Sequence, residues 1–185
     1  MAARSTVRYT FKDYLAIPED PHHRHEIVGG ELHVTPSPRV RHQEVVGNLV
    51  VALHSQAEAQ NLGLVLPGPV GVRLRDDLVL EPDVVFVRQE RLDLVDPEGQ
   101  IHGPPDLVIE VLSPSNQAYD RDLKRKRYLE AGVPEVWIVD ADAGVIEAWR
   151  AGTDHPDRPE GTLEWVVGER VCALEVAGIF ASRRG

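Results

Sequence analysis

The spacing of apolar residues divides the first third of the chain into a helix, a hairpin and a longer helix. "TFKDYLAIPED" predicts a short opening helix, with Thr10 as its N-cap and Pro18 ending it. "HEIVGGELHV" places two apolar-containing runs around Gly29 and Gly30, because glycine supplies the positive φ angles of a two-residue turn. Over residues 39–61, apolar residues recur at intervals of three and four, which predicts an amphipathic helix. These residues are Val45, Val46, Leu49, Val50, Leu53 and Ala57.

The pattern then changes to alternation and short apolar runs, which are typical of β-strands. Strands are expected at residues 64–66, 69–75, 78–87, 107–112, 134–140, 144–150, 162–168 and 171–176. Residues 88–105 and 151–161 are rich in polar residues, glycine and proline, so both are predicted to be loops. Residues 119–131 are predicted to form a helix that ends at Gly132.

The order of these elements indicates the fold class. Residues 106–140 form a strand–helix–strand unit, whose two strands are expected to pair in parallel. The chain mixes helices and strands throughout, and we find no repeat, linker or low-complexity tract. Because 185 residues are enough for one domain with a hydrophobic core, the sequence predicts a single α/β domain over residues 1–185.

Two acidic residues lie where apolar residues dominate. Glu110 lies inside the run "LVIEVL" at residues 107–112, which is predicted to be buried on both faces of a sheet. A carboxylate there is costly unless a positive group meets it. Asp83 directly precedes the apolar run at 84–87 and could lie on a neighbouring strand. Two buried carboxylates share a proton or bind a cation, and oxygen ligands select hard ions such as Mg²⁺ or Mn²⁺. A structural ion pair or an edge-strand position is the alternative interpretation.

Charge and composition limit the classes of function. The formal net charge of −10 weighs against nonspecific nucleic-acid binding, although residues 119–131 hold five basic and three acidic residues and could line a basic groove. Cys172 is the only cysteine, so no internal disulfide can form. The sequence has no apolar stretch of membrane-spanning length, and its first residues lack the apolar core of a secretion signal. We therefore expect a cytoplasmic protein without a membrane partner.

Two other kinds of site are disfavoured. "HHRHE", at residues 22–26, has no cysteine nearby and fits no structural-zinc spacing, so a polar loop before the hairpin is the better interpretation. The chain contains no G-x-S-x-G motif, which a serine hydrolase with a nucleophile elbow would need.

Three stretches resemble the Uma2 family of bacterial proteins: "EPDVVFV", "PPDLVIEVLSPSN" and "DRDLKRKRYLEAGVPEVWIVD". The likeness covers most of the chain, from "FKDYLAIPED" through "HEIVGGELHV" to "VPEVWIVD". That family has the PD-(D/E)XK restriction-endonuclease-like fold. The resemblance therefore implies a central mixed β-sheet flanked by helices.

The resemblance also implies roles for individual residues. Asp83 would be the aspartate of the PD element, Glu110 the acid of the (D/E)XK element, and Glu26 a further metal ligand from an earlier segment. A plain (D/E)XK element would place its lysine two positions after Glu110, where this chain has Leu112. The resemblance points instead to Lys124, whose long stem could extend to the same place from the following helix.

Three further residues are predicted to support the site. Asp120 and Tyr128 lie four residues either side of Lys124, so a helix would place them one turn away on about the same face. They could hold the lysine in place, and simple packing is an equally good interpretation of Tyr128. His42 begins the long helix and could face the site or lie at the surface.

These features together predict a Mg²⁺- or Mn²⁺-dependent nuclease that hydrolyses phosphodiester bonds in DNA. Asp83, Glu110 and Lys124 would be the catalytic residues, and Glu26, Asp83 and Glu110 would hold the ion. The alternative is a non-catalytic module on the same fold that binds nucleic acid or a protein partner, and the acidic net charge favours it. The resemblance also suggests a homodimer.

Overall fold

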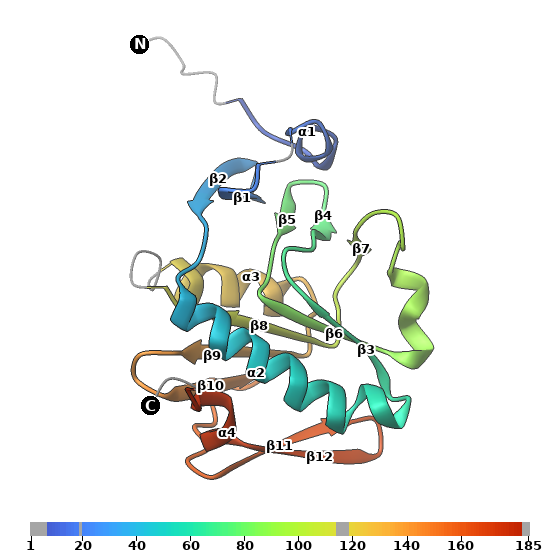
Figure 1. The fold of residues 1–185 in the computed structure, drawn as a ribbon. Coiled ribbons are helices and arrows are strands. Elements are labelled where there is room, and N and C mark those ends of the chain that lie inside the picture. Colours follow the sequence, from blue (N-terminus) through green and yellow to red (C-terminus); the bar gives the residue numbers. More distant parts are fainter. Residues whose placement is uncertain (1–6, 19, 114–118, 183–185) are drawn as a thin grey trace.

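The computed structural model describes residues 7–18, 20–113 and 119–182, except for the side chains of Tyr119 and Asp120 (Figure 1). Its helical segments are α1 (Phe11–Leu15), α2 (Val40–Gln56), η1 (Glu58–Gln60), η2 (Gln89–Leu94), η3 (Tyr119–Lys124), α3 (Arg125–Glu130) and α4 (Val176–Phe180). Its strands are β1 (His23–Val28), β2 (Glu31–Pro36), β3 (Gly63–Pro67), β4 (Val72–Arg75), β5 (Leu78–Leu80), β6 (Val84–Arg88), β7 (Ile101–His102), β8 (Leu107–Val111), β9 (Glu135–Asp140), β10 (Val145–Arg150), β11 (Thr162–Val167) and β12 (Arg170–Glu175).

The central sheet has the strand order β10–β9–β8–β6–β3. β8 and β9 pair in parallel, as the strand–helix–strand unit predicted, and the other neighbours are antiparallel, so the sheet is mixed. All five residues of β8 are buried, because β6 and β9 flank this strand and side chains cover both of its faces. Glu110 therefore lies in the interior, as its apolar neighbours indicated.

A second sheet, with the order β2–β1–β5–β4–β7, lies beside the central one (Figure 1). Its β1–β2 hairpin turns at Gly29 and Gly30, whose φ angles are 60° and 81°. Both values lie in the left-handed region that glycine adopts without steric cost, which confirms the predicted hairpin. β5 belongs to this second sheet and β6 to the central one, so the segment between them connects the two sheets.

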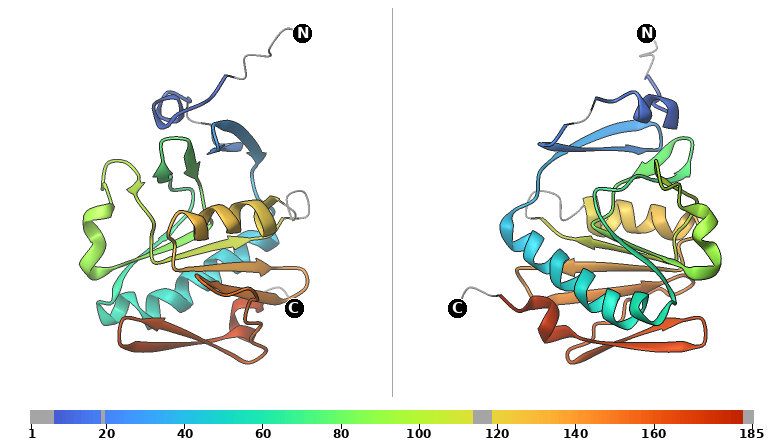
Figure 2. Two further views of the ribbon diagram at one scale, coloured as in Figure 1. Left: turned by 180° about the vertical axis from the view of Figure 1, so that it is seen from behind. Right: turned by 45° about the vertical axis from the view of Figure 1, so that its right-hand side comes forward.

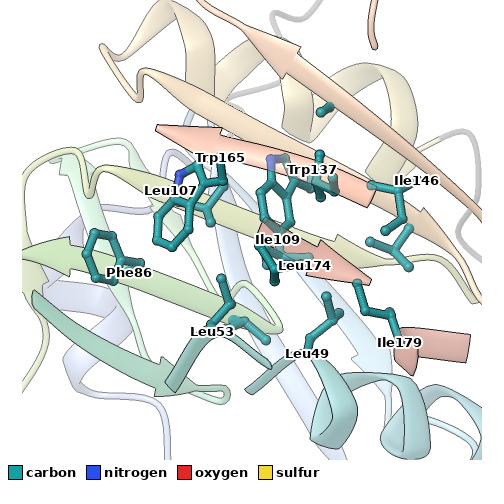
Figure 3. Close-up of a cluster of buried hydrophobic side chains, with 14 of the residues drawn as sticks. Leu49, Leu53, Phe86, Leu107, Ile109, Trp137, Ile146, Trp165, Leu174 and Ile179 are labelled. Atoms are coloured by element: carbon teal, nitrogen blue, oxygen red, sulfur yellow. The ribbon is translucent and has the colours of Figure 1, made fainter. Parts of the chain in front are cut away.

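Two apolar clusters cover the two faces of the central sheet. One packs α2, β11, β12 and α4 against one face, and Figure 3 shows Phe86, Trp137 and Trp165 among its side chains. The other packs α3 and the second sheet against the opposite face, so α2 and α3 lie on opposite sides of the central sheet (Figure 2). Because successive residues of a strand point to opposite faces, Glu110 points to the α3 face, whereas Ile109 joins the α2 cluster.

The structure confirms the opening helix, the long amphipathic helix and most of the predicted strands. Thr10 caps α1, in which its hydroxyl and backbone N–H both donate hydrogen bonds to the Asp13 carboxylate. No helix within the described ranges is long and apolar enough to cross a membrane.

Four predictions of local structure were wrong. Residues 78–87 are two strands rather than one, because Pro82 has no N–H to donate and the chain changes sheets there. The predicted loop at 88–105 contains η2 and β7, which are too short to give a periodic pattern. The polar loop expected at residues 22–26 is mostly strand, because β1 begins at His23 and already pairs with β2 there. Residues 176–180, for which no helix was predicted, form α4, which is stabilised by burial of Val176 and Ile179 against α2 and the sheet.

Candidate active site

A cavity of about 280 Å³ lies where the two sheets meet the start of α2 and the end of η3. Its ionisable lining residues are Arg24, Glu26, Arg39, His42, Asp83, Glu110 and Lys124. They come from five different segments of the chain. The fold thus brings all four of the predicted acid and lysine residues to one place.

Lys124 connects the two glutamates of this cluster. Its Nζ atom lies 2.8 Å from Glu26 Oε1 and 2.6 Å from Glu110 Oε1. All three residues are buried, with about 3% of each residue's surface exposed to solvent or less. A buried charge is tolerated only when it is paired, and this ammonium is the positive group that Glu110 was predicted to need. Leu112, at the position where a plain (D/E)XK element would have its lysine, is buried in the apolar cluster on the α3 face.

One additional hydrogen bond holds each of the two glutamates, Glu110 and Glu26, in place. The Tyr128 hydroxyl donates a hydrogen bond of 2.7 Å to Glu110 Oε1, the oxygen that also contacts Lys124. The Glu81 backbone N–H donates one of 2.8 Å to Glu26 Oε1. Tyr128 therefore contacts the acid of the proposed (D/E)XK element. The side chain of Asp120 lies outside the described residues, so its supporting role stays a prediction.

Asp83 is held by three donors. Its Oδ1 atom lies 2.5 Å from an Arg24 nitrogen, and its Oδ2 atom is 3.1 Å from His42 Nε2 and accepts the Val111 backbone N–H at 2.7 Å. Burial alone would raise the pKa of Asp83. The His42 hydrogen bond, the Arg24 charge and the Val111 N–H outweigh burial and hold this pKa below its ordinary value, so Asp83 is ionised near neutral pH.

Arg24 was missed by the sequence analysis. It lies on β1 two positions before Glu26, and residues two apart on a strand point to the same face. Burial opposes its charge, but Asp83, Glu110 and Glu26 all stabilise the guanidinium and raise the Arg24 pKa. This alternation of a basic and an acidic residue along one face of a predicted strand is the signal that could have identified it.

The acidic side chains of the cavity have the donor chemistry that the predicted divalent ion needs. Carboxylate oxygens from Asp83, Glu110 and Glu26 face one cavity, and this donor chemistry fits Mg²⁺ or Mn²⁺. In the described part of the chain, no three His, Cys, Asp or Glu side chains already stand close enough together to hold a metal. Arg24 and Lys124 occupy the space between the acids, so ion binding requires these side chains to move.

Comparison with known proteins places this site in a family. The model of the Uma2 family, described as "Putative restriction endonuclease", matches residues 11–173, which include every residue of the site. The chain belongs to the Uma2 family. The resemblance inferred from the sequence motifs is thereby confirmed.

A solved structure supports the fold assignment of this Uma2 protein. It is described as a putative nuclease belonging to DUF820 from Anabaena variabilis ATCC 29413. The two are 20% identical, with a TM-score of 0.75, over 92% of this chain and 97% of the other. At this identity the likeness establishes the fold, and it confirms the predicted restriction-endonuclease-like architecture. No curated protein matches the chain.

Changing Tyr128 to phenylalanine tests how firmly the Uma2 site is held. The substitution removes only the hydroxyl that donates to Glu110, so we expect the free energy of unfolding to fall by about 1.5–3 kcal/mol, as for a hydrogen bond to a charged group. Urea denaturation measures this change. Tyr9→Phe, outside the cavity, is the control, and an equal effect of both substitutions would contradict the assigned contact.

Glu81, beside the site, predicts a pH dependence of stability. Burial is the main cause that raises the Glu81 pKa above its ordinary value of 4.5, and the neighbouring charge of Glu26 adds to it, although the Tyr14 hydroxyl donates to Glu81 Oε1 at 2.8 Å. A carboxyl with a raised folded pKa favours folding when protonated. The wild type should therefore lose stability as pH rises from about 4.5 through that raised pKa.

Glu81→Gln should remove this contribution, because glutamine has no proton to lose and its amide oxygen can still accept from Tyr14. Urea denaturation at several pH values between 4.5 and 8 measures the effect, with the exposed Glu31→Gln as the control. If the wild type and Glu81→Gln show the same dependence on pH in this range, the account of Glu81 is wrong.

Proposed function

We propose that this Uma2 protein is a nuclease that uses Mg²⁺ or Mn²⁺ to hydrolyse phosphodiester bonds in DNA. The observation that carries the proposal is the convergence of four buried side chains, those of Glu26, Asp83, Glu110 and Lys124, on one cavity. Burying three carboxylates and an ammonium together is costly, and such clusters of ionisable groups occur mainly at functional sites.

Asp83 and Glu110 would hold the ion, with Glu26 a ligand directly or through water. A bound divalent ion lowers the pKa of its water and neutralises charge that grows on the phosphate. The depressed pKa of Asp83 suits a metal ligand, because the carboxylate is already ionised at neutral pH. His42, which contacts Asp83 Oδ2, would keep that carboxylate oriented.

Lys124 would orient the attacking water or stabilise the negative charge of the pentavalent transition state. Its Nζ atom lies between Glu26 and Glu110, on the wall of the same cavity. Because ion binding requires Lys124 to move from between the two glutamates, the ammonium would take this role once the ion is in place.

The start of α2 would contribute to binding of the phosphate. Ser37, Pro38 and Arg39 line the cavity just before the first turn of this 17-residue helix. Within the described chain, no side chain caps this helix end and its first turn has no acidic residue. Its backbone N–H groups and the exposed Arg39 therefore favour an anion at the cavity. Homodimer formation and a cytoplasmic location stay predictions.

One observation favours a non-catalytic binding module instead. Arg24 and Lys124 already form ion pairs with the three acids, an arrangement that a purely structural ion-pair network would also have. Such a module would bind its partner without a metal and would tolerate neutral substitutions of the acids in a binding assay.

Cleavage of DNA and RNA separates the two functions. Plasmid DNA, duplex and single-stranded oligonucleotides, and RNA should be incubated with the full chain in Mg²⁺, Mn²⁺ or EDTA. We expect DNA cleavage that requires the ion and is lost in Glu110→Gln, while Glu169→Gln, in the turn between β11 and β12, remains active. Absence of cleavage of every DNA with either ion, or equal cleavage by Glu110→Gln, would refute the nuclease proposal.

A further inference from the structure

Arg24 is positioned to control access to the acidic site. Its side chain is 18% exposed, and one of its nitrogens lies 2.5 Å from Asp83 Oδ1. Asp83, Glu110 and Glu26 all stabilise its charge, and these are the same acids that would hold a divalent ion. The guanidinium therefore contacts a carboxylate oxygen that a divalent ion held by Asp83 could use.

The net charge of the buried groups determines whether the site attracts or repels a phosphodiester. Glu26, Asp83 and Glu110 are opposed by Arg24 and Lys124, which leaves one negative charge when His42 is neutral. This buried negative charge repels a phosphodiester, which is itself an anion, and opposes the attraction from Arg39 and the start of α2. A divalent cation changes the sum over the same groups, with the displaced Arg24 still counted, to one positive charge, which attracts a phosphodiester.

Arg24 also has room to move. A second cavity, of about 990 Å³, adjoins the first and shares Arg24, Ser37 and Pro38 with it. A guanidinium that leaves Asp83 can turn toward this larger space on its flexible stem. There its planar group of N–H donors would suit the oxygens of a phosphate on a bound strand.

We infer that a divalent cation displaces Arg24 from Asp83 and that the released guanidinium then binds a phosphate of the nucleic-acid substrate. This inference rests on the proposed nuclease function and specifies an order of events in it. Metal binds before nucleic acid, because Arg24 must exchange one anionic partner for another. Arg24 is thus a competitor of the metal and a ligand of the substrate.

The two roles predict effects of opposite sign for Arg24→Gln. Without the competing charge, the variant should bind Mn²⁺ about tenfold tighter than the wild type, as measured by isothermal titration calorimetry of the full chain. It should bind a DNA duplex more weakly, as measured by fluorescence anisotropy in Ca²⁺, which uses the same oxygen ligands. Arg75→Gln, which removes an exposed arginine paired with Asp77, should change neither affinity.

A second measurement uses the wild-type chain and does not depend on the folding of a variant. Addition of Mg²⁺ should shift the NMR signal of the Arg24 Nε–H group, assigned by comparison with Arg24→Lys. Equal or weaker Mn²⁺ binding by Arg24→Gln, or an Arg24 signal that does not move, would overturn the inference while DNA cleavage by the wild type still supported the nuclease. If the wild type neither binds Mn²⁺ nor cleaves DNA, both proposals fail.

Discussion

Asp83→Asn is expected to lower metal-dependent DNA cleavage by about 10²- to 10³-fold, the usual cost of losing one preorganised electrostatic group in an active site. The amide keeps the size of the carboxylate but loses the negative charge that would hold the ion. The amide also brings an NH₂ donor next to other hydrogen-bond donors, because Arg24, His42 and the Val111 N–H all donate to the Asp83 carboxylate. Cleavage rates at saturating Mg²⁺ measure the effect.

Asp93→Asn is the matched control for this prediction, because Asp93 is exposed on η2, outside the cavity. Circular dichroism should show that both variants are folded. If Asp83→Asn retains more than about a third of wild-type cleavage, Asp83 does not hold the catalytic ion.

Lys124→Met is expected to lower the free energy of unfolding by about 3–5 kcal/mol, the usual cost of breaking a buried ion pair from one side. Methionine fills a similar volume but removes the ammonium that contacts both Glu26 and Glu110. Urea denaturation at pH 7 measures the loss. Lys126→Met, on an exposed position of the adjoining helix α3, should change stability by less than about 0.5 kcal/mol.

Neutralising Glu26 and Glu110 as well should restore much of the free energy of unfolding that Lys124→Met loses. In the triple variant Glu26→Gln, Glu110→Gln and Lys124→Met, the two carboxylates that contacted the ammonium are also neutral, and uncompensated buried charge is the main cost of breaking such a pair from one side. The triple variant should therefore be more stable than Lys124→Met alone and inactive in cleavage. If it is no more stable than the single variant, the cost of Lys124→Met does not arise from the two glutamates.

Local patterns predicted the parts of this fold that local physics determines. Paired glycines required a turn, so the hairpin at Gly29 and Gly30 was correct. The four-residue spacing of Val45, Leu49 and Leu53 predicted a helix with one buried face, and all three residues are buried on α2. The burial of Glu110 followed from the apolar residues on both sides of it.

The lysine of the site was found through family resemblance. Leu112 occupies the expected lysine position and is buried among apolar side chains, so the local pattern around Glu110 contains no amine. Lys124 reaches Glu110 only because β8, η3 and α3 fold back on each other, a tertiary arrangement that its sequence spacing alone does not specify.

Arg24 and the division of residues 78–87 into two strands depend on tertiary structure in the same way. Arg24 meets Asp83 because β1 pairs with β5, and a sequence separation of 59 gives no local sign of the contact. Pro82 marks a possible break in a strand, but only the presence of a second sheet explains why the chain leaves one sheet for the other there.

The claim that Asp83 and Glu110 hold a divalent ion is tested most directly by a crystal structure of the full chain soaked in Mn²⁺. Anomalous scattering from manganese locates the ion without reference to activity. The account predicts a peak at the oxygens of Asp83 and Glu110, with Arg24 moved away from Asp83. Full occupancy of a manganese site elsewhere, with Arg24 still paired to Asp83 and Lys124 still between Glu26 and Glu110, would contradict it.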